Sequence, residues 1–247
     1  MFSLIRAEVY RLLRKKSMYV YFCSLAAAYA LIAFVRSGGF NAESIVGDAV
    51  NFLSLLPIVA GGFIFTAVYT DDLASRALPA LIGSGMSRGG IVAAKLILAA
   101  MLGAFVFGLA PLVPYATHAA LGFAASGAVM ARIYAAALKF CLVTVGYCAL
   151  SGAAVYGLQR ATAAVVLYIL LSLNVVGGLL AVLLRNALGE AAATAIASRT
   201  LSGITDRLLD ALVGSASALP PLVEFTAYTA ASVLLSAALF YKKELEF

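Results

Sequence analysis

Side chains that could do chemistry are few in this 247-residue sequence. The single histidine, His118, cannot by itself build a histidine-based metal site or a catalytic triad. The three cysteines lie in apolar runs without the spacing of a metal site, and we interpret them as packing residues. The sequence also lacks a P-loop, an HExxH motif and a GxSxG motif. We therefore predict no catalytic residue, no metal site and no cofactor in this chain, which is not expected to be an enzyme.

Polar side chains inside long apolar runs are the next candidates for function. Such groups are costly in lipid unless they are paired, and ionisable ones mark functional sites by default. The uncharged candidates are Ser54, Thr66, Ser172 and Asn174. We interpret them as lining a translocation path or a seam between subunits, with ordinary interhelical hydrogen bonds as the alternative. No Asp or Glu stands in the middle of a run, which disfavours proton or sodium coupling within the chain.

A second group of candidates lies in the segment 71–88, between two apolar runs. It begins with Asp71 and Asp72, continues through Arg76 and ends at Arg88, with Lys95 seven residues further on. Its apolar residues, which can form one side of a short helix, are Leu73, Leu78, Leu81 and Ile82. A short helix with exposed charges can dock into a groove of a partner protein. An ordinary connecting loop is the alternative.

Residues 1–16 carry the periodicity of a short amphipathic helix. The apolar stripe, with steps of three and four residues, consists of Phe2, Ile5, Val9 and Leu12. The basic residues, mostly off the stripe, are Arg6, Arg11, Arg14, Lys15 and Lys16. This pattern predicts a helix lying at the membrane surface with its basic face against anionic headgroups. A solvated basic segment is the alternative, and we expect the following apolar run to be retained as a span.

The composition requires lipid around these elements. Hydrophobic residues make up 64% of the chain, charged residues 11%, and the mean hydropathy is +1.04. A soluble protein has about 45–50% apolar and about 25% charged residues. About 20 apolar residues cross a bilayer as a helix. The runs of this length are 18–35, 49–70, 91–110, 140–158, 161–184 and 222–241. We predict an all-α integral membrane protein with six transmembrane helices in one domain, 1–247, and a tight hairpin at 157–160.

The Lys and Arg residues lie mostly in the segments on one side of the six predicted spans. With six crossings the basic residues on the side of the N-terminus are Arg6, Arg11, Arg14, Lys15, Lys16, Arg76, Arg88, Lys95, Arg160, Lys242 and Lys243. The entire net charge of +6 falls on this side, because the loops of the other side balance their charges. The positive-inside rule then makes it cytoplasmic, with both termini. The segment 185–221 would lie outside as one or two short helices.

The order of these features resembles the membrane subunit of an ATP-binding-cassette (ABC) exporter of the type-2 class, close to the small six-span permeases linked with peptide-antibiotic immunity or drug efflux. The resembling segments are residues 1–16 (the family's elbow helix), 71–88 (its coupling helix), 185–221 (its paired outer helices) and 240–244 (its basic-then-acidic ending). The sequence departs from the family at two places. The family more often has Glu where Asp71 or Asp72 stands, and Pro near Gly85.

The resemblance implies a mechanism and partners. Two permease chains, identical or paralogous, would pair in a bacterial plasma membrane, each seating a cytoplasmic ABC ATPase subunit that carries ATP and Mg²⁺. Closure of the ATPases would open an outward path for a peptide antibiotic, a drug or a lipid-like molecule. The residues implied in this coupling are Asp71, Asp72, Arg76, Arg88 and Lys95, and the elbow residues would help to seat the ATPase. No nucleic acid is expected as a partner. The alternative is a stand-alone six-span secondary carrier or a membrane receptor without an ATPase.

Overall fold

The computed structural model describes residues 2–35, 42–74, 81–83, 85–123, 126–214 and 217–242, and every regular element in these ranges is a helix. The helices, in chain order, are α1 (Phe2–Leu13), α2 (Lys16–Val35), α3 (Ala42–Phe65), the π-helix η2 (Thr66–Thr70), α4 (Asp71–Ala74), α6 (Arg88–Leu109), α7 (Leu112–Ala120), α8 (Gly127–Leu158), α9 (Ala161–Ser172), α10 (Val175–Leu188), α11 (Glu190–Ala197), α12 (Leu201–Val213) and α13 (Leu219–Lys242). The prediction of an all-α protein is confirmed for this part of the chain.

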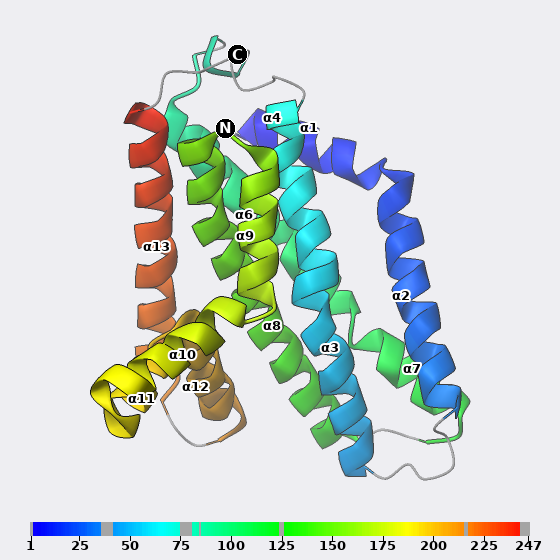
Figure 1. The fold of residues 1–247 in the computed structure, drawn as a ribbon. Helices are drawn as coiled ribbons and strands as arrows, with labels where there is room; N and C mark the ends of the chain where they lie inside the picture. Colours follow the sequence, from blue (N-terminus) through cyan, green and yellow to red (C-terminus); the bar gives the residue numbers. More distant parts are fainter. Residues whose placement is uncertain are drawn as a thin grey trace.

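Helix α8 is the centre of the bundle and packs against α3, α6, α9, α12 and α13 (Figure 1). Small residues allow this close approach, because a side chain at Gly146 would collide with Leu201 and one at Gly152 would press on the ring of Tyr69. Aromatic rings fill the space beside α8. The rings of Phe65 and Tyr168 stack with their centroids 5.0 Å apart, which joins α3 to α9. Small residues and tight packing are what hold helices together in lipid.

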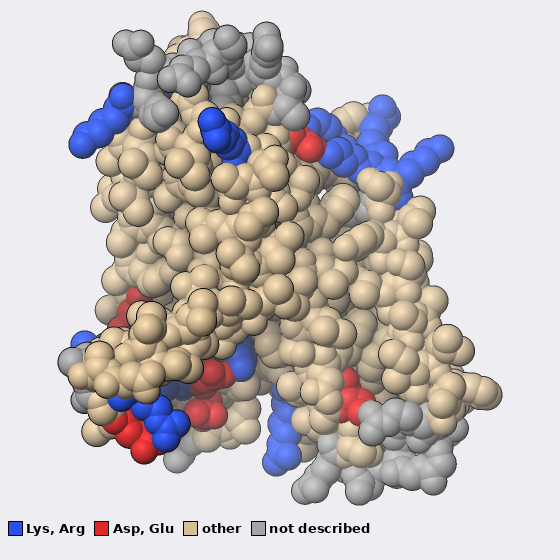
Figure 2. Space-filling model, viewed as in Figure 1, with Lys and Arg blue, Asp and Glu red and all other residues tan. Residues whose placement is uncertain are grey.

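Helix length and surface composition fit a protein that crosses a membrane. The spans long and apolar enough, within the described ranges, are Ser44–Thr70, Arg88–Ala120, Gly127–Leu158 and Leu219–Lys242. The bent pair α9–α10 adds a further span if it is counted as one, and the apolar helix Tyr19–Val35 is shorter. Figure 2 shows charged residues at the two ends of the molecule and a broad uncharged band between them.

The helices alternate in direction, so that particular segments gather at each end (Figure 1). Helix α1, the end of α4, the start of α6, the α8–α9 turn and the end of α13 lie at the top of Figure 1. We call this the basic end, because the described Lys and Arg side chains there include Arg11, Lys15, Arg88, Arg160 and Lys242. Helices α10, α11 and α12 lie towards the opposite end. Helix α1 and the last turn of α13 thus lie at the same end of the bundle.

Two helices extend beyond the apolar runs that predicted them. Helix α3 begins at Ala42 and α8 at Gly127, well before the predicted starts at 49 and 140. At the start of α8 the side chain of Ser126 accepts a hydrogen bond from the Val129 amide, the usual way of satisfying a free amide at a helix start. An apolar run marks the section of a helix that lipid covers, whereas the cap marks where the helix starts. The predicted hairpin is confirmed, since α8 ends at Leu158, Gln159 is left-handed and α9 begins at Ala161.

The predicted span 161–184 is not a straight helix. Helices α9 and α10 are bent by 62° at the break between them. Asn174 lies at this break with a φ of 54°, a left-handed conformation that Asn tolerates better than most residues. Its amide donates to the Leu171 carbonyl at 2.9 Å, and its own carbonyl accepts from the Gly178 amide at 2.8 Å. The polar residue in this run therefore shapes a bend.

The segment predicted to lie outside forms α11 and α12, which agrees with the expectation of one or two short helices there. Helix α12 is held against α8 and α13 by buried apolar residues that include Leu201, Ile204 and Leu208. Ion pairs fasten it on both sides, because Asp206 pairs with Lys139 of α8 and Arg207 pairs with Glu224 of α13.

Candidate functional site

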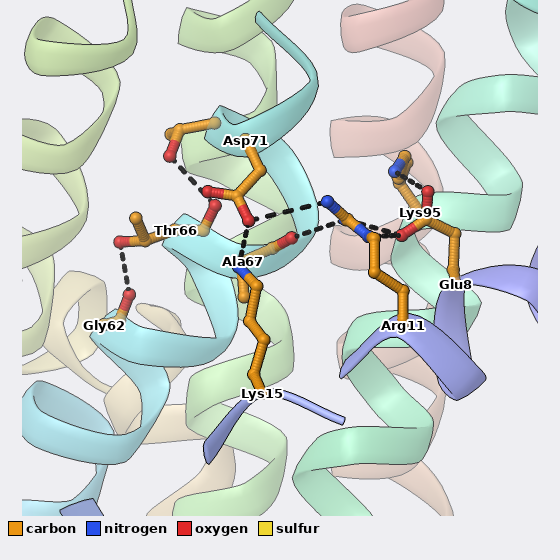
Figure 3. Close-up of polar contacts among 9 residues, drawn as sticks. Glu8, Arg11, Lys15, Gly62, Thr66, Ala67, Asp71 and Lys95 are labelled. Carbon is orange, nitrogen blue, oxygen red and sulfur yellow. Dashed lines mark hydrogen bonds and ion pairs between the residues drawn. The ribbon is translucent and has the colours of Figure 1, made fainter. Parts of the chain in front are cut away.

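An ion-pair cluster joins three helical segments at the basic end of the bundle (Figure 3). The cluster consists of Glu8, Arg11 and Lys15 from the N-terminal segment, Asp71 at the start of α4, and Lys95 of α6. Figure 3 shows these side chains pointing towards one another in the space between α1 and the end of the α3–η2–α4 segment. We refer to these five residues as the ion-pair cluster.

Glu8 is the inner carboxylate of the ion-pair cluster. It shares the buried face of α1 with Leu12, which is fully buried four residues later. One carboxylate oxygen of Glu8 accepts hydrogen bonds from Arg11 Nε at 3.0 Å and Nη2 at 2.6 Å. The other oxygen lies 3.5 Å from Lys95 Nζ. The side chain of Lys95 is only 2% exposed and that of Glu8 14%, so their attraction acts largely away from water.

Asp71 is the outer carboxylate. It forms an ion pair with Lys15, and its Oδ2 lies 3.6 Å from Arg11 Nη1. Because Arg11 contacts both Glu8 and Asp71, it bridges the two carboxylates. The result is an alternating chain of charges from Lys95 to Lys15. Asp71 is therefore linked directly to the N-terminal segment and, through Arg11 and Glu8, to α6.

The backbone next to Asp71 is a π-helix, and it also binds Arg11. The Thr66 carbonyl accepts from the Asp71 amide, five residues on, and from the Thr70 hydroxyl at 2.9 Å. The Ala67 carbonyl accepts from Arg11 Nη2 at 3.2 Å. A π-turn widens the helix and disturbs its regular bonding, which is why such turns recur at functional sites. Here the wider turn presents a carbonyl to the guanidinium of α1.

The predicted coupling residues are partly brought together. Asp71 and Lys95 lie in the ion-pair cluster, whereas Arg88 lies at the start of α6, where its guanidinium binds the Phe240 carbonyl and stands 5.2 Å from the centre of the Phe240 ring. Asp72 belongs to α4, and Arg76 lies outside the described residues. The carboxylates do not begin a separate helix, since α4 continues directly from α3 and η2.

The predicted surface residues of the N-terminal segment divide into two sets. Arg11 and Lys15 turn inward to the ion-pair cluster, while Arg6, Arg14 and Lys16 are exposed. Helix α1 lies across the basic end of the bundle at a wide angle to α2 (Figure 1).

The polar residues predicted to line a path do not form a common site in the described structure. The hydroxyls of Ser54 and Thr66 bond the Asn51 and Gly62 carbonyls of their own helix at 2.7 Å. Ser172 ends α9 and is half-buried, while Asn174 shapes the bend and is exposed. Ser54 and Thr66 therefore bond carbonyls of their own helix, and Asn174 lies at the bend between α9 and α10.

The sequence analysis did not select two groups that bind Arg11 in this site. They are the Glu8 carboxylate and the Ala67 carbonyl. Glu8 had a signal in the sequence, because it is the acid that stands at the spacing of the apolar stripe in an otherwise basic helix. The Ala67 carbonyl had none, since a π-turn leaves no clear pattern in sequence.

The ion-pair cluster connects α1 to α4 and α6 through charged side chains. No group of three or more His, Cys, Asp and Glu side chains suited to a metal occurs in the described ranges. His118 is fully buried in α7, with Nδ1 2.7 Å from the Pro114 carbonyl. The known proteins add no identification: no model of a protein family matches this sequence, and no curated protein matches it.

Proposed function

We propose that this chain is the membrane-spanning permease subunit of an ATP-driven exporter of the type-2 ABC class. The observation that carries the proposal is the position of the ion-pair cluster. It ties the start of the segment 71–88 to α1 and to α6 at the end of the bundle where basic residues gather. An external motor that pushed on this segment would therefore move three helices together.

The proposal includes a topology of six crossings. Helix α2 would be the first and the bent pair α9–α10 the fifth, added to the long apolar helices. The basic end would face the cytoplasm of a bacterial cell, following the positive-inside rule. Helix α1 and the end of α13 both lie at that end, which supports placing both termini in the cytoplasm.

The mechanism we propose is a shift between two packings of a permease pair. A second copy or a paralogue would complete the path, and two cytoplasmic ATPases would bind ATP and Mg²⁺. Each ATPase would press on the segment 71–88, with Arg76 and Arg88 as the basic contacts and Asp71 as the link to the ion-pair cluster. ATP shifts the equilibrium only by its differential binding to the two states. The substrate would be a peptide antibiotic, a drug or a lipid-like molecule.

The proposal is tested by purifying the chain together with its ATPase subunit. The tagged chain, purified from its own source in mild detergent, should retain a subunit that hydrolyses ATP. We expect Arg76→Glu to lower the retained ATPase activity at least about tenfold, because reversing one interfacial charge replaces attraction by repulsion. Arg160→Glu is the matched control, since Arg160 is exposed at the same end but outside the segment 71–88. Retention of full activity by Arg76→Glu would contradict the proposal.

A stand-alone carrier is the second candidate, and the pair of Glu8 and Lys95 is the observation in its favour. This ionisable pair is largely buried, as groups that couple ions to transport are. Substrate uptake by the purified chain alone in liposomes, abolished by Glu8→Gln, would support this function over the ATP-driven one.

A further inference from the structure

A crevice separates α2 from the rest of the bundle. Helix α2 is attached near its two ends, to α1 and to α7, and packs only slightly on α3. Between them lies a partly open cavity of about 230 Å³. Residues of α2, α3 and α6 form its walls, among them Tyr19, Phe22, Ala26, Phe52, Leu56 and Phe105. A second cavity of about 190 Å³ follows the same seam towards Ala33 and shares Leu25 and Phe52 with the first.

The apolar lining of the first cavity favours a hydrocarbon chain over a polar ligand. Apart from the hydroxyl of Tyr19 its side chains are apolar. A peptide or sugar in this place would leave hydrogen-bonding groups unpaired at considerable cost, whereas a hydrocarbon chain would not. A dry apolar cavity of about 150 Å³ is already enough for benzene. A cavity of about 230 Å³ can therefore hold part of a longer chain.

The first cavity fits within one leaflet of a bilayer. From Tyr19 to Ala26, which line this cavity, α2 rises about 10 Å at about 1.5 Å per residue. The hydrocarbon core of a bilayer is about 30 Å thick, so that one leaflet contributes about 15 Å. The first cavity could therefore hold much of one acyl chain, whereas the lining of the second also includes Asp48 and Asn51.

Basic residues stand at the upper mouth of the seam. Lys16 lies one helical turn before Tyr19, and Arg14 precedes it in the link between α1 and α2. Both side chains are exposed, and neither contacts a carboxylate among the described side chains. Lys15, between them, is engaged by Asp71. Figure 2 shows Lys and Arg gathered where α1 meets α2, at the upper right. Positive charge above an apolar slot is complementary to an anionic lipid.

We propose that this seam binds one anionic phospholipid from the leaflet at the basic end. One acyl chain lies between α2 and the α3–α6 wall, and the phosphate is held by Arg14 and Lys16. The site is independent of any ATPase, so that its test and that of the proposed function can fail separately.

The test is lipid binding to the purified, delipidated chain in a neutral detergent, followed by native mass spectrometry. The probes are dioleoyl phosphatidylglycerol and dioleoyl phosphatidylcholine. We expect one phosphatidylglycerol per chain to bind about thirtyfold more tightly than phosphatidylcholine, the preference that two basic residues at a headgroup provide. The double variant Arg14→Gln/Lys16→Gln should lose this preference. Arg160→Gln/Lys242→Gln, which neutralises two exposed charges at the same end, should keep it.

A substitution inside the seam tests the position of the acyl chain. Ala26→Phe fills the cavity and should reduce binding of both lipids at least about tenfold. The new ring would exclude the methylene groups of the acyl chain, which would then lose the free energy gained by their burial. Ala27→Phe is the control, since Ala27 is exposed on the same helix and does not line the seam. Equal binding of the two lipids by the unmodified chain, or unchanged preference in the Arg14→Gln/Lys16→Gln variant, would overturn the proposal. The charge variants decide the matter if Ala26→Phe does not fold.

Discussion

Removing the negative charge of Glu8 should destabilise the protein far more than removing that of an exposed acid. Glu8 Oε1 lies 3.5 Å from Lys95 Nζ, and the side chains are 14% and 2% exposed. At an effective dielectric constant of about 20 the attraction over this distance is about 5 kcal/mol. Desolvation of the two charges opposes this attraction, but the desolvation cost of Lys95 remains when Glu8 alone is neutralised. We expect Glu8→Gln to lower the free energy of unfolding by about 3 kcal/mol.

The assay is a double-mutant cycle of unfolding in mixed dodecyl maltoside and dodecyl sulfate micelles, followed by circular dichroism. Lys95→Met should cost less than Glu8→Gln, because Glu8 retains its bonds from Arg11. The double variant should resemble Lys95→Met, giving a coupling energy of about 3 kcal/mol. Glu190→Gln is the matched control, because Glu190 pairs with Arg185 at 3.1 Å with both side chains mostly exposed, and it should cost less than about 0.5 kcal/mol. The reasoning is refuted if Glu8→Gln costs no more than Glu190→Gln, or if the two costs add in the double variant.

Two further predictions concern packing and backbone conformation. Gly61→Ala should cost about 1–3 kcal/mol in the same assay, since the new methyl group would collide with the buried Tyr168 hydroxyl that bonds the Pro57 carbonyl, while the neighbouring Gly62→Ala should be neutral or slightly stabilising. Equal costs for the two glycines would contradict the described packing of α9 on α3. Asn174→Gly should be tolerated and Asn174→Val should cost about 1–2 kcal/mol, because a β-branched residue is strained at the positive φ of the bend; a straight α9–α10 helix would predict the opposite order.

Composition and apolar runs were sufficient to predict the helical class, because a run of about 20 apolar residues has few structures available in lipid. They were not sufficient for the ends of the helices. Helix α8 begins thirteen residues before the predicted span, where Ser126 caps it. The side chain that sets this start is polar and lies outside the apolar run on which the prediction rested.

The candidate site was predictable only in pieces. Asp71 and Lys95 were selected together as coupling residues, whereas the basic residues of α1 were selected separately, from an amphipathic helix. Their meeting depends on how α1 lies across the bundle, which one sequence does not specify. The backbone conformation of Asn174 was also not predicted. Its polarity suggested a path or a seam, and the structure adds that this residue is left-handed at the bend between α9 and α10.

The π-turn at Thr66–Thr70 has a consequence for any comparison of residues along this helix. An ordinary α-helix advances about 100° with each residue, so one additional residue in a turn puts the two flanking stretches out of phase by about that angle. A helical wheel drawn continuously from Ala42 to Ala74 would therefore assign Asp71 to the wrong face. Only when the wheel is restarted after Thr70 does the carboxylate point to Arg11 and Lys15.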